Sequence, residues 1–524
     1  MTARIFIDVS DLLEYAAGNR NLSGIQRVQA ELIEQALREP ARILCVMTQA
    51  WNAGIRALPA APLAALLGLL KRGEGGGAAA HALLAELHRD APGVQPVPGG
   101  ALLVAGAFWM GSGNTPLHAM LRRHGMGLHV FIHDLIPITH PDVCVPDLVR
   151  EFTAVLGEVL LNADGFIANS EHTAGTIRTL LAESGLPPRR VVATPLAHGI
   201  GPRAPEWTPR IASLREQPFV LSVGTIEARK NHALLVRAWT LLGDAGPLLV
   251  LVGKRGWKTD DFDAAMQDAP QDRILILTDI SDAELEALYG ACLFTAFPSR
   301  TEGWGLPVGE SLARGRLCVA SDRGSLPEVG GEFALYIDPD DPAAAAALFR
   351  RLVDEPDWRA SLEARIRDSF TPRAWPEVAE SIITALESAP APAPSEPLCA
   401  PMPPAMHWQP TPLTGEHAIH PAHDVLRHPL RVALSEGWEK PAPSGARILG
   451  DRAHLHLHAP TDGRLRLTLA AGGFARLRVE GRSLLLWPGA VRQVTLPLRA
   501  GVNRLVLRVQ GFGRRPVLRA LDWS

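Results

Sequence analysis

Short apolar runs alternate with longer helical patterns over the first 388 residues. The runs occupy residues 5–7, 43–46, 102–104, 130–132, 166–168 and 191–192 in a first series, and 219–223, 248–252, 274–277, 293–297 and 318–320 in a second. Continuous runs of β-branched and aliphatic residues are typical of strands buried on both faces of a parallel sheet. A polar, Pro-containing stretch, 201–217, separates the two series. We therefore predict two Rossmann-like, doubly wound α/β domains, residues 1–205 and 206–388, that face a cleft.

The pattern changes beyond residue 388. Residues 389–425 contain an Ala-Pro repeat and further prolines, which predicts an extended linker. In residues 426–524 apolar and polar positions alternate with period two, as at 454–458, 464–467, 476–479, 494–496 and 504–509. This alternation is typical of half-buried antiparallel strands, so we expect a small, all-β C-terminal domain with the form of a β-sandwich.

The distribution of charge sets this last domain apart. The 524 residues carry 52 Lys+Arg and 55 Asp+Glu, a net charge of -3. Residues 427–524 hold 17 Lys+Arg and 6 Asp+Glu, a net of +11, which leaves 35 against 49, or -14, for residues 1–426. The basic face either is a solvated surface or binds an anionic partner, acidic polysaccharide or phospholipid headgroups. The acidic body argues against a nucleic-acid partner.

Targeting and redox signals favour a cytoplasmic protein. The five cysteines are widely spaced and form no C-x-x-C pair, which is typical of a reducing compartment. The N-terminus is acidic where a signal peptide would be basic. The longest apolar run, 57–70, contains two prolines and is shorter than the ~20 residues that span a bilayer. Residues 63–70, followed by Lys71 and Arg72, form either a buried helix or a segment that docks on the inner face of the membrane.

Candidate chemistry is concentrated in the segment Phe297 to Glu310, which reads FPSRTEGWGLPVGE. It leaves the end of a predicted strand, passes through a Gly-rich loop and enters a helix with Pro307 near its start. Free backbone N–H groups and the positive end of the helix dipole then face the cleft, where a phosphate can bind. Glu302 in the loop and Glu310 in the first turns of the helix can reach one ligand from two sides.

A cationic segment stands at the start of the second domain. Arg229 and Lys230 follow the strand 219–223 and precede a helical pattern, which places both cations at the carboxyl edge of the sheet. Facing the Gly-rich loop, they would stabilise negative charge on a departing diphosphate.

These two segments resemble the retaining nucleotide-sugar glycosyltransferases of family 4, which have the GT-B fold. The E-x7-E signature of that family corresponds to Glu302 and Glu310, and V-G-T-I-E-x-R-K-N at 223–231 is close to the form in bacterial mannosyl- and rhamnosyltransferases of surface polysaccharide assembly. Supporting matches lie at 252–257, 278–282, 320–322 and 326–329. The resemblance covers residues 1–388.

The first domain agrees with the resemblance. Gly24 lies within the segment Ser-Gly-Ile-Gln-Arg-Val at 23–28. This segment is similar to a family loop in which the backbone approaches the donor phosphates or the acceptor. His133, at the end of the strand 130–132, corresponds to a family histidine that contacts the donor sugar. Ser170 also lies in a family-like segment, but we interpret it as a helix N-cap.

The resemblance implies transfer of a hexose, with retention, from a nucleotide diphosphate sugar to a glycan or lipid-linked glycan acceptor. A mannose-like sugar and GDP-mannose are favoured, and the donor is a substrate, so no separate cofactor is expected. Glu302 would hold the sugar hydroxyls, Glu310 the ribose and His133 the sugar from the opposite domain. Arg229, Lys230 and the amides around Gly305 and Leu306 would stabilise the diphosphate. Gly24 and Ile280 complete the expected donor contacts.

Three features bear on the alternatives. Thr225 stands where many family members have an arginine that binds the diphosphate, so a catalytically impaired protein that binds sugar nucleotide or polysaccharide is a second hypothesis. No essential metal is expected, because Asp338-Pro339-Asp340, although it matches D-x-D, reads as a turn and helix cap. His454, His456 and His458 share one face of a predicted strand, which is either a solvated face or a metal site.

Overall fold

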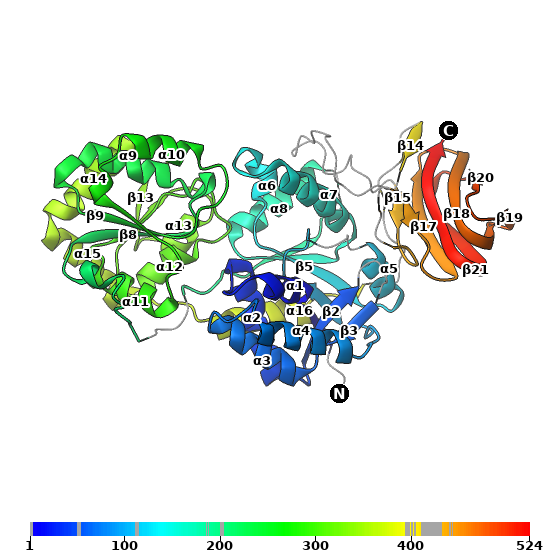
Figure 1. Cartoon of the computed structure of the whole chain (residues 1–524), viewed down its shortest axis with the longest axis horizontal. Coiled ribbons are helices and arrows are strands. Elements are labelled where there is room, and N and C mark those ends of the chain that lie inside the picture. The colour runs from blue at the N-terminus through cyan, green and yellow to red at the C-terminus, as the bar shows by residue number, and fades with distance from the viewer. Residues whose placement is uncertain are drawn as a thin grey trace.

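The computed structural model describes residues 4–49, 54–110, 115–184, 186, 188–199, 204–392, 399, 402, 405–409, 432–439, 442 and 444–524. Two α/β domains and an all-β domain follow one another (Figure 1). The first α/β domain lies in the middle of the molecule, between the second α/β domain and the C-terminal domain (Figure 1). The predicted fold class of two doubly wound α/β domains and a small all-β domain is confirmed.

The first sheet has the strand order β3-β2-β1-β4-β5-β6-β7. The central strands are parallel and buried because their residues are apolar on both faces. The strands are β1 (Ile5–Asp8), β2 (Ile43–Gln49), β3 (Gly54–Ala57), β4 (Ala101–Val104), β5 (Gly127–Ile132), β6 (Gly165–Ala168) and β7 (Arg190–Ala193). The helices are α1 (Ser10–Gly18), α2 (Gly24–Arg38), α3 (Ala60–Lys71), α4 (Ala78–Asp90), α5 (Thr115–Arg123), α6 (Ile136–Thr139), α7 (Pro146–Asn162) and α8 (Glu171–Glu183).

Two features of the first domain were not settled by the sequence. The pattern missed the strand β3, and it left two interpretations of residues 63–70 open. The antiparallel edge strand β3 pairs with β2 and is too short and too polar to stand out. The apolar run at 57–70 forms α3, whose leucines at 63, 66, 67 and 70 are buried, so the alternative of a buried helix holds. Within the described residues, no helix is long and apolar enough to cross a membrane.

The second sheet is parallel throughout, with the order β10-β9-β8-β11-β12-β13. Its strands are β8 (Phe219–Val223), β9 (Leu248–Val252), β10 (Ile274–Leu277), β11 (Thr295–Phe297), β12 (Cys318–Ser321) and β13 (Leu335–Ile337). Its helices are α9 (His232–Leu242), α10 (Asp260–Gln267), α11 (Asp282–Ala291), α12 (Leu306–Ala313), α13 (Leu326–Gly330), α14 (Pro342–Asp354) and α15 (Pro356–Ser369). Strand order reverses beside β8, where the loops after β8 and β11 meet at the carboxyl edge.

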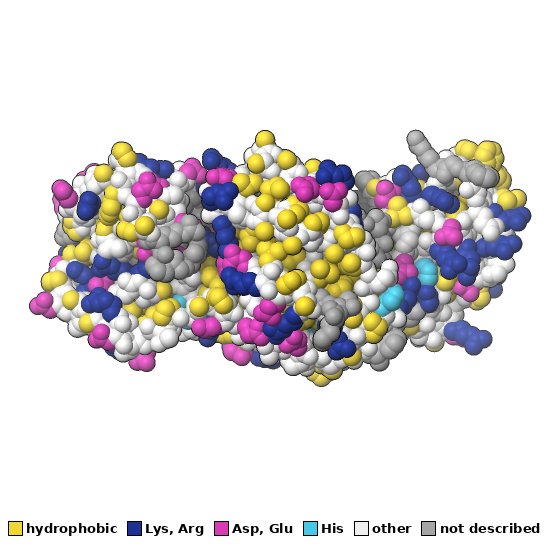
Figure 2. Space-filling model, turned by 90° about the horizontal axis from the view of Figure 1, so that it is seen from below, with side chains coloured by type: hydrophobic (Ala, Val, Ile, Leu, Met, Phe, Trp, Pro, Cys, Tyr) yellow, Lys and Arg dark blue, Asp and Glu magenta, His cyan; other side chains and the backbone are white. Residues whose placement is uncertain are grey.

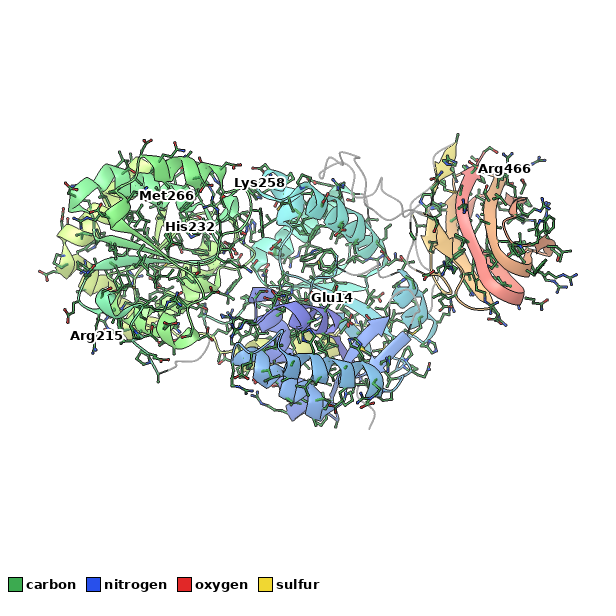
Figure 3. All side chains as sticks on the ribbon, viewed as in Figure 1. Glu14, Arg215, His232, Lys258, Met266 and Arg466 are labelled. Carbon is green, nitrogen blue, oxygen red and sulfur yellow. The ribbon has the colours of Figure 1, made fainter. Side chains whose placement is uncertain are left out.

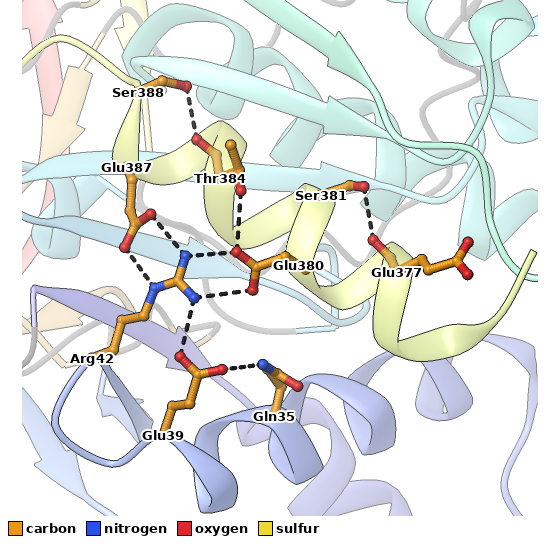
Figure 4. Close-up of polar contacts among 9 residues, drawn as sticks. All are labelled: Gln35, Glu39, Arg42, Glu377, Glu380, Ser381, Thr384, Glu387 and Ser388. Atoms are coloured by element: carbon orange, nitrogen blue, oxygen red, sulfur yellow. Dashed lines mark hydrogen bonds and ion pairs between the residues drawn. The ribbon is translucent and has the colours of Figure 1, made fainter.

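The last helix before the Pro-rich stretch, α16 (Trp375–Glu387), returns to the first domain. It packs on α2, β1 and β4, and its buried apolar side chains join the core that continues through both α/β domains. Arg42 fixes the polar side of this contact by pairing with Glu380 and Glu387 of α16 and with Glu39 (Figure 4). The predicted boundary at 388 therefore assigns to the second domain a helix whose apolar face is buried on the first.

The C-terminal strands are hydrogen-bonded into one antiparallel sheet around two long strands, β18 (Gly463–Val479) and β21 (Gly501–Trp523). The expected form of a β-sandwich, with two separate sheets, is therefore not confirmed. The others are β14 (Met406–Trp408), β15 (Val432–Leu434), β16 (Ala446–Arg447), β17 (Arg452–Ala459), β19 (Arg482–Leu486) and β20 (Val491–Leu498). The predicted strands 464–467 and 476–479 are both part of β18, because the glycines at 472 and 473 continue the ladder across a register shift and do not form a turn.

Two further expectations for this region change. Most of the predicted linker 389–425 lies outside the described residues, but β14, within it, pairs with β21.

The histidines of β17 do not form a solvated face: His454 and His456 are buried. Their side of the sheet lies toward α5, where Arg123 pairs with Glu436 and α5 contacts β15. Among the described residues, no group of three or more His, Cys, Asp or Glu could hold a metal ion.

We expect Arg42→Gln to loosen α16. At neutral pH the variant should lose roughly 1 kcal/mol of unfolding free energy, the order expected for a partly exposed ion-pair network. Hydrogen bonds from Arg42 lower the pKa of Glu380 and of Glu387 below the ordinary 4.5. The contribution of these ion pairs to the free energy of unfolding is therefore complete above pH 4.5, and it is lost as the pH falls through the lowered pKa values of the folded state. Thermal unfolding should therefore separate wild type from variant at neutral pH and not in acid. An equal difference at both pH values would contradict the ion-pair account.

Candidate functional site

The loop after β8 is held against the loop after β11. Asn231 adopts a left-handed conformation, with a φ of 55°, and its buried amide donates hydrogen bonds to the carbonyls of Pro298 (3.2 Å) and Pro339 (2.8 Å). The backbone N–H of Arg300 donates to the carbonyl of Arg229 at 2.8 Å. These bonds fix the short turn that carries Arg229 and Lys230 beside the Gly-rich segment, as the sequence predicted.

Glu302 lies between the two cations. Its Oε2 is 2.6 Å from Arg229 Nη1, and its Oε1 is 2.7 Å from Lys230 Nζ. Arg229 also pairs with Glu227, with 2.7 Å between Nη2 and Oε1. Lys230 Nζ lies 4.6 Å from the centre of the Phe297 ring. Three of the four predicted catalytic residues therefore form one ionic cluster around the buried Glu302 carboxylate.

Burial and charge act in opposite directions in this cluster. Burial alone would raise the pKa of Glu302, but the cations of Arg229 and Lys230 lower it to about 2, so the carboxylate is ionised. Burial alone would lower the pKa of Arg229, but Glu302 and Glu227 keep it above its ordinary value. Burial lowers the pKa of Lys230, and Glu302 partly opposes that effect.

The fourth predicted residue, His133, meets the same loop from the first domain. A Cβ on Gly303 would lie 2.0 Å from the His133 carbonyl oxygen, so only glycine permits this approach. That carbonyl accepts a 2.6 Å hydrogen bond from Asn169 Nδ2, and the His133 ring donates from Nε2 to the Ala105 carbonyl at 2.9 Å. Burial lowers the pKa of His133 to about 4, so the imidazole is neutral near pH 7.

Asp134 directly follows His133 at the end of β5 and also belongs to the site, although only His133 of this pair was predicted to be catalytic. Burial raises its pKa, and the cation of Arg229 opposes that rise. A signal for it was present, because it follows β5 directly and the carboxyl ends of strands collect polar residues.

The amino end of α12 lies opposite the amino end of α2. Gly305 precedes α12 with a φ of 106°, and Leu306 is the first residue of the helix. A Cβ on Gly24, the first residue of α2, would lie 3.9 Å from Leu306 Cδ1. The first residues of the two helices thus lie close together across the domain boundary, and helix N-termini attract anions.

Glu310 is bound from both domains. Tyr289 Oη donates to its Oε2 at 2.9 Å, and Arg27 Nη1 of α2 lies 3.4 Å from its Oε1. Arg27 also pairs with Asp282 at 3.8 Å. The sequence named the 23–28 segment but not Arg27, because only the fold brings residues 27 and 310 together. Ile280, the remaining predicted contact, packs on the core of the second domain beside this group.

Three further contacts join the two α/β domains. The Glu328 carboxylate accepts hydrogen bonds from the N–H groups of Glu171 (2.7 Å) and His172 (2.6 Å) at the start of α8. Trp257 Nε1 donates to the Val143 carbonyl at 3.1 Å, and Lys258, which faces the first domain in Figure 3, donates to that of Asp142.

One minor sequence interpretation holds, and a second holds only in part. Ser170 caps α8 by accepting a hydrogen bond from the Thr173 N–H. Asp338 accepts from the Asp340 N–H in a turn and pairs with Arg323. The cap of the following helix, α14, is Asp341 and neither aspartate of the D-x-D motif.

Comparisons with known proteins agree with this geometry. Residues 204–369 match the family model of glycosyl transferases group 1. The chain is 33% identical over 242 residues to O-antigen chain mannosyltransferase B of Escherichia coli, covering 44% of this chain and 63% of that protein. It is 27% identical over 248 residues to the serotype-specific mannosyltransferase WbdA of Escherichia coli, covering 44% and 30%. The chain thus spans less than two thirds of these curated relatives.

Among solved structures, sucrose-phosphate synthase from Thermosynechococcus elongatus aligns with a TM-score of 0.49 at 19% identity, covering 74% of this chain and 98% of that one. The family match in the second domain, together with two doubly wound sheets that meet at their loops, confirms the predicted GT-B fold class.

Adding one methyl group at residue 303 tests whether the loop approaches the His133 carbonyl. We expect Gly303→Ala to overpack the domain contact and to lower the thermal-unfolding midpoint by several degrees, since overpacking costs about 1–3 kcal/mol. Gly290→Ala is the matched control, because a Cβ there meets nothing within 4 Å and alanine favours the helix. If Gly303→Ala were as stable as Gly290→Ala, the loop would not contact His133 as described.

Proposed function

We propose that the protein is a retaining glycosyltransferase of the family 4 type that transfers a hexose from a nucleotide diphosphate sugar to a glycan or lipid-linked glycan acceptor in surface polysaccharide synthesis. The observation that carries the proposal is the Arg229–Glu302–Lys230 cluster, with ion pairs of 2.6 and 2.7 Å, in the segment that matches glycosyl transferases group 1. The two relatives named as mannosyltransferases favour mannose as the sugar and GDP-mannose as the donor.

The proposed chemistry requires the cluster to exchange partners. Without donor, Glu302 neutralises both cations. With donor bound, the diphosphate takes over Arg229 and Lys230, and the freed Glu302 carboxylate accepts hydrogen bonds from the sugar hydroxyls. The N–H groups at Gly305 and Leu306 hold the phosphate oxygens.

The opposite domain would orient the reacting sugar. His133, neutral near pH 7, meets the loop at Gly303 and positions the sugar, while Glu310, linked to Arg27 and Tyr289, binds the ribose hydroxyls. The acceptor oxygen bonds to the anomeric carbon on the face from which the phosphate oxygen leaves, and that phosphate oxygen takes the proton of the acceptor hydroxyl, so the anomeric configuration is retained. The cations stabilise the diphosphate as the bond to the sugar breaks.

A panel of nucleotide sugars tests the donor. Guanosine, uridine and thymidine diphosphate sugars are each added to the protein during thermal unfolding, and GDP-mannose should raise the midpoint most. A ligand at ~100 times its Kd adds about 2.7 kcal/mol to the free energy of unfolding, which is several degrees. If no member of the panel raised the midpoint, the enzyme proposal would fail. NMR of the first product then reports the anomeric configuration.

Glu302→Gln separates binding from transfer. Removing the charge that competes for Arg229 and Lys230 should tighten nucleoside diphosphate binding about tenfold, since a charged hydrogen bond contributes about 1.5–3 kcal/mol. Transfer should fall about a hundredfold, because the hydroxyl contacts weaken in the transition state. Glu363→Gln, a buried glutamate paired with Arg316, is the control and should change neither quantity. Unchanged transfer in Glu302→Gln would remove Glu302 from the mechanism.

One observation favours a second candidate function, a catalytically impaired protein that binds sugar nucleotide or polysaccharide. Thr225 supplies no cation, and the guanidinium of Arg229 is already engaged by both Glu302 and Glu227. If Arg229 stays with these carboxylates when donor binds, Lys230 alone faces the diphosphate. Donor-induced stabilisation without transfer or hydrolysis would establish this alternative.

A further inference from the structure

The outer face of the C-terminal sheet carries a row of arginines. Arg452 of β17 lies directly opposite Arg508 of β21, and Arg508 lies directly opposite Arg478 of β18. All three side chains are exposed. These three residues, the arginine row, cross three neighbouring strands, and Arg476 adds a fourth cation two positions along β18 on the same face.

This row is unfavourable for the domain by itself. Side chains directly opposite on neighbouring strands have Cβ atoms about 4.5–5.5 Å apart, and like charges at that distance are destabilising. Within the described residues, no carboxylate pairs with Arg452, Arg476, Arg478 or Arg508. The arginines of the body differ: Arg42 and Arg229 each pair with at least two carboxylates. An external anion is the missing partner of the row.

One end of this face of the sheet is covered by the first domain, and the other end is exposed. His454 and His456 of β17 are on the side of Arg452 and are buried toward α5 of the first domain. The arginine row starts at Arg452, two residues before His454 on the same strand, and continues across β21 and β18. In Figure 2, dark blue side chains gather over the C-terminal domain at the right, beyond cyan histidines near its border with the first domain. The domain is thus docked so that its basic face stays open.

Apolar side chains stand exposed beside the cations. Leu485 of β19 lies directly opposite Arg476 and is 62% exposed, and Phe474, two positions before Arg476 on the same face, is 69% exposed. Trp487 and Val491, at the β19–β20 turn, are 45% and 52% exposed, and the Arg492 guanidinium lies 4.0 Å from the centre of the Trp487 ring. We call Phe474, Leu485, Trp487 and Val491 the apolar rim.

We propose that the arginine row and the apolar rim bind the surface of a bilayer that contains anionic phospholipids. The guanidinium groups take the lipid phosphates, for which their planar donor geometry is suited, and the apolar rim enters the headgroup region. An acidic glycan would use the arginines and Trp487, but it would leave Leu485 and Val491 in water. The presence of aliphatic side chains beside the aromatic ones is the reason to choose the bilayer.

The proposed bilayer contact says where the proposed transferase works, and it rests on the proposed function only for its biological purpose. A transferase whose acceptor is carried on a lipid must work at a bilayer. The binding itself needs neither donor nor transfer, so the vesicle experiment and the nucleotide-sugar experiments can fail independently.

The first test is co-sedimentation of the full chain with phosphatidylcholine vesicles that do or do not contain phosphatidylglycerol. Binding should require the anionic lipid and weaken with salt. In the triple variant R452Q/R478Q/R508Q it should fall about a hundredfold, since each basic residue near such a surface contributes about fivefold. The matched control, R38Q/R72Q/R89Q, removes the same charge from the first domain, where each arginine is paired with a carboxylate, and should bind like wild type.

The second variant, F474S/L485S, keeps every charge and tests the apolar rim. It should weaken vesicle binding about tenfold and make the remaining binding more sensitive to salt. Thermal unfolding checks that both variants fold, and the wild-type lipid and salt dependence stands without them. Equal binding to neutral and anionic vesicles, or wild-type binding by the arginine variant, would overturn the proposal. Tighter binding to an acidic polysaccharide that F474S/L485S leaves intact would assign the face to a glycan instead.

Discussion

The buried charge of Glu302 is the constraint on which the arrangement of the loops at the site depends. A carboxylate that leaves water must be paired, since an isolated buried charge is far too costly. Arg229 and Lys230 supply the pairing, and they can do so only because Asn231 holds the loop after β8 against the loop after β11. One ionic cluster thereby fixes the two loops at the point where the strand order of the second sheet reverses.

The neighbouring glycine extends this constraint to the first domain. Gly303 lets the loop approach the His133 carbonyl, and Glu310, seven residues further on, reaches Arg27 on α2. At the far side, α16 returns to pack on α2 and is held by Arg42. The second domain is thus tied to the first at its carboxyl edge by polar contacts and at its C-terminal end by an apolar helix. This division suits a site that must admit a ligand, because polar contacts exchange more readily than a packed core.

The arginines of the C-terminal domain are arranged differently from those of the two α/β domains. In the described part of the body, arginines are largely neutralised by nearby carboxylates, whereas Arg452, Arg478 and Arg508 stand opposite one another with no carboxylate partner among the described residues. Its core is ordinary, with leucine and valine side chains turned inward along β18 and β21. This charge does not stabilise the domain, and it is the basis for the proposed contact with an anionic bilayer.

Local pattern predicted much of this molecule. Apolar runs located most of the strands of both α/β sheets, because a strand buried on both faces must be apolar throughout. The spacing of Glu302 and Glu310, and the pair Arg229 and Lys230, pointed to one site because the ends of parallel strands share an edge. The sequence alone also determined the basic character of the last domain. Tertiary structure decided the rest: Arg27 meets Glu310, α16 leaves its own domain, and His454 and His456 are buried, not solvated. Each of these depends on which surfaces pack together across long stretches of chain, and no local pattern of apolar and polar residues contains that information.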